Sequence, residues 1–279
     1  MKEDRRAWLV FVGPALLGLF VFYIIPFLWA FYYSLTSNGF ERNFVGLQNY
    51  IDLFQNEAFW VAAKNTMLFS GVFAPVVMVL AFACAAFLND RLIPNSYVRS
   101  ILILPYVLPS AAIVAIWHVF FDYGGLINTT LQLLGVDPLT WMYGENIRWI
   151  VFSLYMWRNV GLFAIILLCA IHSINDEYYE VASLEGASRF QMHWHITMPL
   201  LKPIFFFLLV LACVNGMRIF KEAYFLGGAY PTEALYTLQH FMNNQFDKFN
   251  YSTITAAGYV LLIFMLLIIY IAARLAKRL

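Results

Sequence analysis

The chain has few side chains with the spacing that covalent chemistry requires. His193 and His195 form its one close histidine pair, and no third ligand accompanies them, so a metal site is not predicted. The pattern G-x-x-x-x-G-K-[ST], which cradles the phosphates of a bound nucleotide, is absent from the 279 residues. No nucleophile and base stand together either. We therefore expect no catalytic residue, no metal and no cofactor bound by this chain, and not an enzyme.

Another group of side chains could bind a cargo without transforming it. These are polar and aromatic residues placed inside long apolar runs: Trp117, Tyr155, Trp157, Arg158, Asn159, Asn215, Arg218 and Glu222. Charged groups are costly in an apolar medium, so they tend to face a water-filled cavity or a bundle interior. Aromatic rings pack on the apolar face of a sugar, while Asn and Arg donate hydrogen bonds to its hydroxyl groups. This mixture is typical of a carbohydrate path.

Two interpretations of Arg158 and Arg218 stay open. Either guanidinium could bind a carboxylate or phosphate on an acidic sugar with paired donors. Alternatively, each could form an internal ion pair with Glu222 or Asp122, or extend toward the outer interface from near a helix end. The tryptophans also have a second interpretation, because aromatic residues form belts at membrane interfaces.

Long apolar runs must position these residues. The chain is 62% hydrophobic and 12% charged, whereas ordinary soluble domains are about 45–50% apolar and about 25% charged. A membrane span needs about 20 apolar residues. The runs that qualify are 8–35, 64–88, 99–121, 149–172, 201–222 and 254–274. We expect an all-α, polytopic membrane protein with six transmembrane helices in a single domain, 1–279.

Three further features of the sequence bear on this class. The first apolar run is too long for a secretory signal, and no small-residue cleavage site follows it, so it is predicted to be an uncleaved span. Cys84, Cys169 and Cys213 all lie in apolar runs, which favours small core residues over a disulfide framework. A net charge of +1 argues against a nucleic-acid partner.

Lys and Arg are distributed unequally between the two sets of span ends. One set carries Lys2, Arg5, Arg6, Arg91, Arg99, Arg189, Lys202, Arg274, Lys277 and Arg278, and the other carries Arg42, Lys64, Arg148 and Lys248. Because short cytoplasmic loops are enriched in Lys and Arg, the richer side is predicted to be cytoplasmic. Both termini and the loop at 174–200 would then face the cytoplasm.

That loop is a polar insert, longer than a simple connection needs, which indicates a structure and a role of its own. Its first half predicts a short helix capped by Asn175 or Asp176, with acidic residues near the positive N-terminal end. Small and aromatic residues recur on one face of the predicted helix: Tyr179, Ala182, Gly186 and Phe190. Such a helix suits docking into a groove on a partner, and Gly186 would let the two backbones approach closely.

The insert resembles the cytoplasmic coupling loop of ATP-binding-cassette importer permeases. That family's pattern is Glu-Ala-Ala, three residues, Gly, nine residues, Ile, one residue, Leu, Pro. The matching positions here keep every spacing: Glu180, Val181, Ala182, Gly186, Ile196, Met198 and Pro199. Val181 and Met198 depart from the pattern, but both are apolar. The outer segments Phe44 to Phe54 and Phe121 to Asn128 resemble the carbohydrate branch of the same family.

The resemblance implies a type I importer permease that moves a sugar or oligosaccharide, neutral or acidic, delivered by an extracytoplasmic binding protein. The implied partners are a second, different permease, two ATPase subunits that bind ATP and Mg²⁺, and the lipid bilayer of a bacterial cytoplasmic membrane. The implied ATPase-coupling residues are Glu177, Glu180, Ala182, Glu185, Gly186, Ala187, Arg189, Ile196 and Pro199. The spans on either side of the loop would contribute to the substrate cavity. An ion-coupled secondary transporter, for which we find no internal repeat, and a purely structural subunit are the alternatives.

Overall fold

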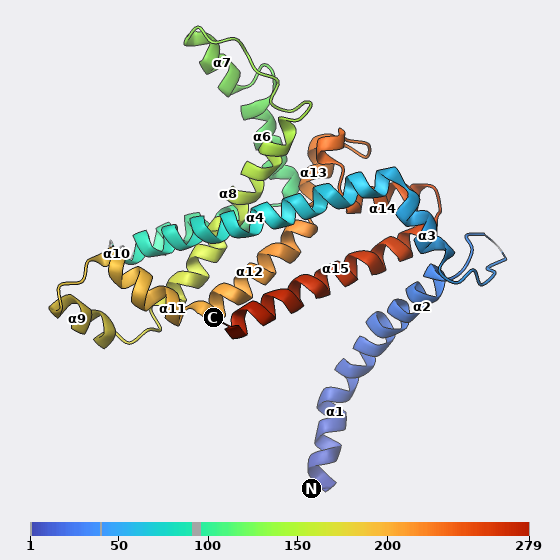
Figure 1. Ribbon diagram of the computed structural model, residues 1–279, viewed down its shortest axis with the longest axis horizontal. Coiled ribbons are helices and arrows are strands. Elements are labelled where there is room, and N and C mark those ends of the chain that lie inside the picture. Colours follow the sequence, from blue (N-terminus) through green and yellow to red (C-terminus); the bar gives the residue numbers. More distant parts are fainter. Residues whose placement is uncertain (1, 40, 91–95, 279) are drawn as a thin grey trace. The chain divides into compact units, whose positions relative to one another are not determined.

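The computed structural model describes residues 2–39, 41–90 and 96–278 (Figure 1). Regular structure in these ranges is helical, apart from an isolated antiparallel bridge between Thr36 and Phe44. Among the described residues, six helical stretches are long and apolar enough to cross a membrane: Phe11–Ser34, Glu57–Asn89, Ser110–Leu133, Ile147–Ile171, Lys202–Gly227 and Tyr251–Ile271. The predicted all-α class with six membrane helices is confirmed.

The chain forms two compact units, and the first comprises residues 2–60 and 241–264. Its helices are α1 (Lys2–Leu19), the π-helical turn η1 (Phe20–Ile24), α2 (Ile25–Ser34) and α3 (Gln48–Gln55), with most of α14 (Leu238–Asp247) and the first half of α15 (Tyr251–Arg278). The Tyr259 hydroxyl on α15 donates to the Phe27 carbonyl on α2 at 2.6 Å, and its ring packs against Phe27 and Phe31. These contacts hold the first apolar run against the last.

The second unit comprises residues 61–240 and 265–278 and holds every predicted site residue. Its helices are most of α4 (Glu57–Asp90), then α5 (Ser96–Val107), α6 (Ser110–Phe121), α7 (Leu126–Leu133), α8 (Ile147–Ile171), α9 (Glu177–Leu184), α10 (Arg189–Met192), η2 (His193–Thr197), α11 (Met198–Leu200), α12 (Lys202–Met217), α13 (Phe220–Gly227) and η3 (Glu233–Leu235). Its core is built mainly from α4, α8 and α12, each of which contributes fully buried apolar side chains, for example Phe69, Phe163 and Leu208.

Two glycines allow helices of this unit to approach closely. A Cβ on Gly161 of α8 would lie 1.8 Å from the Leu102 carbonyl oxygen of α5, and a Cβ on Gly216 of α12 would lie 2.9 Å from the Ser70 Cα of α4. The Ser70 hydroxyl also donates to the Cys213 carbonyl at 2.8 Å. Small residues and interhelical hydrogen bonds commonly hold helices together in a membrane. Burial of apolar side chains contributes little there, because lipid tails are as apolar as a neighbouring helix.

The third and fifth predicted spans differ from the structure because each is broken. The run 99–121 divides into α5 and α6 at Leu108 and Pro109, since proline lacks an N–H and disfavours helical backbone in the residue before it. The run 201–222 divides into α12 and α13 at Arg218 and Ile219. There the Arg218 N–H bonds to the Asn215 carbonyl, three residues back, which tightens and ends the α12 ladder.

The predicted bias of Lys and Arg toward one side depends partly on side chains that the structure does not describe. Arg91 lies outside the described residues, as do the side chains of Lys2, Arg5, Arg6, Lys277 and Arg278. The orientation of the chain in the membrane therefore stays a prediction.

Candidate functional site

The polar insert begins with α9, and local capping explains both of its ends. The Asn175 side-chain oxygen accepts from the Glu177 N–H at 3.1 Å, so Asn175 satisfies one of the free donors at the helix start. The helix ends at Leu184, and Gly186 in the turn after it has a φ of +81°. The Ala187 N–H reaches back to the Ala182 carbonyl at 3.0 Å, and the Gly186 N–H bonds to the Ser183 carbonyl at 3.1 Å. This is a Schellman termination.

The predicted helix face is wrong in its second half. Because α9 ends at Leu184, Gly186 lies in the turn after it and Phe190 belongs to α10, so neither shares a helical face with Tyr179 and Ala182. A Cβ on Gly186 would meet nothing within 4 Å in this chain. Within the chain, glycine is needed at 186 for its left-handed backbone, which other residues adopt only with strain.

A second helical stretch follows the turn and leads into α12. Ser188 caps α10 with a reciprocal capping box, in which the Ser188 N–H donates to the Gln191 side-chain oxygen at 2.7 Å. The π-helical turn η2 and the short α11 continue the stretch to Leu200, with Pro199 in the first turn of α11. The Tyr179 and Thr197 hydroxyls lie 2.9 Å apart and join α9 to η2.

The insert exposes apolar side chains, which we call the apolar ridge: Val181, Leu184, Phe190 and Trp194. Leu184 is 87% exposed, and the stacked rings of Phe190 and Trp194 are 76% and 58% exposed. The predicted coupling residues lie in the same insert as the ridge: Glu177, Glu180, Glu185, Gly186, Arg189 and Pro199 are exposed, and Ala182, Ala187 and Ile196 are half-buried. Exposed apolar groups rimmed by charge are typical of a surface that contacts a protein.

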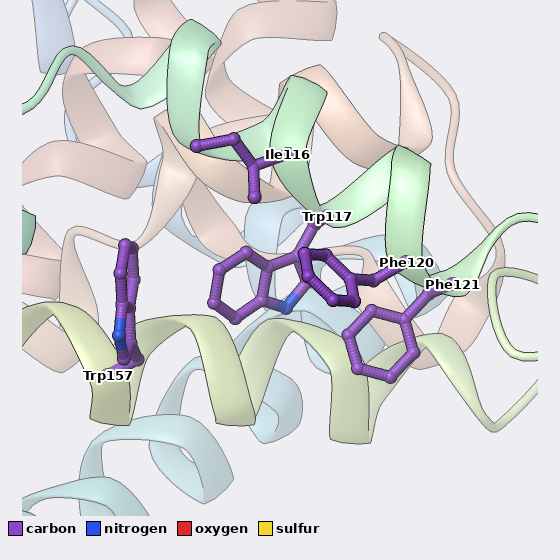
Figure 2. Close-up of a pocket in the computed structure, with 5 residues that line it drawn as sticks. All are labelled: Ile116, Trp117, Phe120, Phe121 and Trp157. Carbon is purple, nitrogen blue, oxygen red and sulfur yellow. The ribbon is translucent and has the colours of Figure 1, made fainter. Parts of the chain in front are cut away.

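The intramembrane residues of the same unit gather around α6 and α8. Trp117 on α6 and Trp157 on α8 lie with ring centroids 5.0 Å apart, and Figure 2 shows them side by side. Together with Ile116, Phe120 and Phe121 they line an open hollow of about 300 Å³. The Trp117 indole N–H donates to the Ser153 hydroxyl at 3.3 Å, which fixes its ring. The predicted pair of tryptophans thus forms one aromatic surface.

A polar cluster lies further along the same two helices. Arg158 on α8 forms an ion pair with Glu222 on α13, and both groups are largely buried, 22% and 12% exposed. The Ser110 hydroxyl at the start of α6 donates to the Glu222 carboxylate at 2.9 Å and accepts from Arg158 at 2.7 Å. Of the two interpretations of Arg158, the internal ion pair with Glu222 is therefore the one observed. Asp122 instead contacts His118 at 2.9 Å.

The remaining predicted path residues fall into two groups. Tyr155 and Asn159 are buried in the core of α8, where the Tyr155 hydroxyl donates to the Ala212 carbonyl at 3.2 Å and the Asn159 amide donates to the Tyr155 carbonyl at 2.8 Å. Asn215 is partly buried near the end of α12, and Arg218 is exposed at the break before α13. In this chain, the first two side chains act in packing and the last two lie at the helix break.

Sequence reasoning missed several contributors to both sites. Ser110, Ser153 and Thr197 are short hydroxyl side chains with no distinctive spacing, and only the fold brings them to Glu222, Trp117 and Tyr179. The aromatic surface did leave a signal: Trp117 and Phe121, like Ile116 and Phe120, are four residues apart and so lie on one helical face.

These features define a polytopic helical membrane protein with an exposed polar insert between its fourth and fifth membrane stretches. Residues 77–279 match the family described as "Binding-protein-dependent transport system inner membrane component". The chain belongs to this family of transport permeases, and it is a multi-pass membrane protein.

Relatives along nearly the whole length support this assignment. The chain is 30% identical over 271 residues to the trehalose/maltose transport system permease protein MalF of Thermococcus litoralis, covering 94% of this chain and 91% of that protein. It is similar to a solved bacterial ABC transporter involved in import of the acidic polysaccharide alginate, with a TM-score of 0.88, 25% identity, and coverage of 100% and 98%. It is also similar to a structure of a bacterial alginate ABC transporter in complex with an alginate pentasaccharide-bound periplasmic protein. The TM-score is 0.84 and the identity is 26%, over 99% of this chain and 96% of that chain.

Proposed function

We propose that this chain is the permease subunit of an ATP-driven importer that moves a sugar or oligosaccharide delivered by an extracytoplasmic binding protein. Membership of the family, and relatives that carry trehalose, maltose or alginate, support this cargo class. The observation that carries the proposal furthest is the exposed apolar ridge on an insert that keeps every spacing of the coupling-loop pattern. The chain serves transport and is not itself catalytic.

The coupling step assigns a role to each part of the insert. The ridge docks on a separate ATPase subunit, Glu180 forms a charged contact with a basic groove there, and Pro199 fixes the angle at which the insert rejoins α12. ATP and Mg²⁺ bind to the ATPase. Its nucleotide-driven closure moves the spans as rigid bodies, so that the cavity faces first the binding protein and then the cytoplasm.

The partners follow from the number of docking surfaces. An ATPase pair offers two grooves, and this chain supplies one insert, so a second permease completes the complex. We propose a heterodimer of two different permeases with two ATPase subunits, in a bacterial cytoplasmic membrane with both termini in the cytoplasm.

The charge of the cargo is the finer part of the proposal. The hollow formed by Trp117 and Trp157 suits the apolar face of a sugar ring. Arg158 is neutralised by Glu222, whereas Arg218 is exposed and, in the described part of the chain, forms no ion pair. A cation exposed at membrane depth favours an anionic guest, so we propose that acidic sugars are among the cargoes.

The test is uptake by proteoliposomes that contain the whole complex, with alginate oligosaccharide and maltose as labelled cargoes. The proposal predicts uptake that requires ATP, persists with a protonophore, and falls for the acidic cargo alone in Arg218→Gln. Uptake abolished by the protonophore and indifferent to ATP would instead establish an ion-coupled secondary transporter. Equal loss of both cargoes in Arg218→Gln would contradict the charge assignment only.

A further inference from the structure

Tyr179 and Thr197 form a contact that lies outside the coupling-loop pattern. Tyr179 precedes the pattern's Glu180, and Thr197 fills its variable position between Ile196 and Met198. Their hydroxyl oxygens are 2.9 Å apart, with Thr197 fully buried and Tyr179 half-buried. The contact joins α9, none of whose residues is buried, to the helical stretch that runs into α12.

The π-helical turn η2 places the Thr197 hydroxyl where Tyr179 can reach it. In η2 the Met198 N–H bonds to the His193 carbonyl, five residues back, so the turn holds one residue more than an α-helical turn. The Thr197 hydroxyl accordingly donates toward the Met192 carbonyl at 3.5 Å, also five residues back, and lies 3.4 Å from His193 Nδ1. Each hydroxyl can donate or accept, so the Tyr179–Thr197 bond forms with either one as the donor.

The far side of η2 is anchored in the unit. The His193 ring packs edge-on against Phe82 of α4, with centroids 6.3 Å apart, and Leu201, directly after α11, is buried in the main core. A displacement of α9 can therefore pass through Tyr179 to Thr197, and from Thr197 into helices that are packed against the spans. The covalent path from α9 to the same place runs through the turn at Gly186 and all of α10.

We propose that Tyr179 is a positioning residue for coupling: its hydrogen bond to Thr197 sets the orientation of α9 on the spans, so that movement of the docked ATPase is transmitted. This inference rests on the proposed function and adds to it two residues and one bond. Without that bond α9 still docks, but part of its displacement is absorbed by the turn between α9 and α10.

The experiment compares cargo transported per ATP hydrolysed in proteoliposomes with the complete complex. Tyr179→Phe removes one hydroxyl and keeps the ring, and Thr197→Val removes the other and keeps the branched shape. Thr197→Ser retains the hydroxyl. Tyr178→Phe is the matched control, because Tyr178 is the adjacent tyrosine and is exposed, and its hydroxyl has no hydrogen-bond partner among the described residues. Melting temperature and amount of assembled complex are measured for every variant.

We expect Tyr179→Phe and Thr197→Val each to lower the amount of cargo transported per ATP roughly three- to tenfold. This factor corresponds to the net free energy of one hydrogen bond. The double variant should be no worse than either single variant. Thr197→Ser should keep most of the wild-type ratio of cargo to ATP, because it retains the hydroxyl, and Tyr178→Phe should match the wild type. Melting temperature and assembly of Tyr179→Phe should remain near the wild-type values.

Three results would overturn the inference. A wild-type ratio in Tyr179→Phe would show that the bond transmits nothing, and this variant decides the matter even if Thr197→Val fails to assemble. Loss of assembly in Tyr179→Phe would mean that the bond holds the fold together and does not orient α9. Effects that multiply in the double variant would mean that the two residues act separately. If the wild-type complex showed no ATP-dependent uptake, the proposed function itself would fail.

Discussion

At the scale of single residues, the Arg158–Glu222 ion pair places two charges in the largely buried interior of the second unit. Both charges lie among helices of a membrane protein, and Ser110 bonds to each of them. Removing one member of a buried pair leaves an unpaired charge, which costs several kcal/mol, whereas removing both removes that penalty. The pair thus ties α13, beyond the break in the fifth run, to α6 and α8.

Glu222→Gln should therefore destabilise the protein by about 3 kcal/mol. The double variant Arg158→Gln/Glu222→Gln should recover part of this loss, because it leaves no unpaired charge. Thermal unfolding in detergent measures both. The single variant Arg158→Gln is measured as well. A loss of stability in the double variant that equals the sum of the losses in Glu222→Gln and Arg158→Gln would contradict the ion pair.

A second residue-scale prediction concerns His240, which is fully buried near the start of α14. Its Nδ1 lies 2.9 Å from the Thr237 hydroxyl, and its ring packs against Phe220, Tyr224 and Tyr236. Burial penalises the charged imidazolium and lowers the pKa of His240 from 6.5 to about 4. The folded protein therefore binds a proton less readily at this ring than the unfolded chain does.

The sign of the pH effect follows from that difference. Between pH 6.5 and about 4 the unfolded state binds the proton and the folded state does not, so stability falls as the pH falls through this window, by about 3 kcal/mol in total. His240→Phe keeps an aromatic ring and removes the titration. The melting temperature of the wild type should drop more steeply than that of the variant over this range. Parallel pH profiles would show that His240 does not titrate in this way.

At the scale of helices, the contact between α5 and α8 depends on the absence of a side chain at Gly161. A methyl group there would overlap the Leu102 carbonyl oxygen, so the two helices would have to separate. Gly161→Ala should destabilise the fold by about 1–3 kcal/mol, as overpacking of a close contact does. Gly258→Ala on α15 is the control, because a methyl group there meets nothing within 4 Å. Equal melting temperatures would argue against the close approach.

A second helix-scale prediction separates two roles of Gly186. If glycine is needed for its φ of +81°, Gly186→Asn should retain more cargo-stimulated ATP hydrolysis than Gly186→Ala, because Asn tolerates left-handed backbone better. If glycine is needed because the ATPase approaches closely, the larger Asn should be the worse substitution. The ratio of the two activities in the assembled complex decides between these roles.

The helices themselves could be predicted because their signals are local. Apolar runs, the capping of α9 by Asn175, and proline at the start of α6 and α12 can all be recognised within a few residues of sequence. The error at Gly186 also has a local cause, since a small residue four positions after Ala182 fits a helical face as well as it fits a helix end. The break at Arg218 and Ile219 contains no proline or glycine, and Gly216, two residues earlier, lies at the close contact with α4, so the local sequence did not predict the break.

The candidate sites could be predicted only in part, because pairs distant in sequence need the fold. Arg158 and Glu222 were both recognised as unusual, but choosing Glu222 over Asp122 as the partner required the packing of α13 against α6 and α8. The hydroxyls of Ser110 and Thr197 gave no signal at all. Tyr155 and Asn159 matched the composition of a sugar path, yet both are buried: Tyr155 bonds to the Ala212 carbonyl of α12, and Asn159 bonds to the Tyr155 carbonyl within α8.

At the scale of the whole molecule, the exposed insert must face the compartment that contains ATP if it is to dock on an ATPase. The distribution of Lys and Arg predicts this orientation, and the apolar ridge supplies a surface for a partner to cover. The charges at the span ends and the exposed apolar side chains of the insert are independent features of the chain. Both can be tested at Leu184, whose side chain is the most exposed of the ridge.

The most direct measurement is labelling of Leu184→Cys, in a variant without Cys84, Cys169 and Cys213, by a membrane-impermeant maleimide. We predict no labelling of intact cells, full labelling of inside-out vesicles stripped of the ATPase, and protection when the ATPase subunit is added back. Labelling of intact cells from the outside, or inside-out labelling that the ATPase does not reduce, would contradict the account.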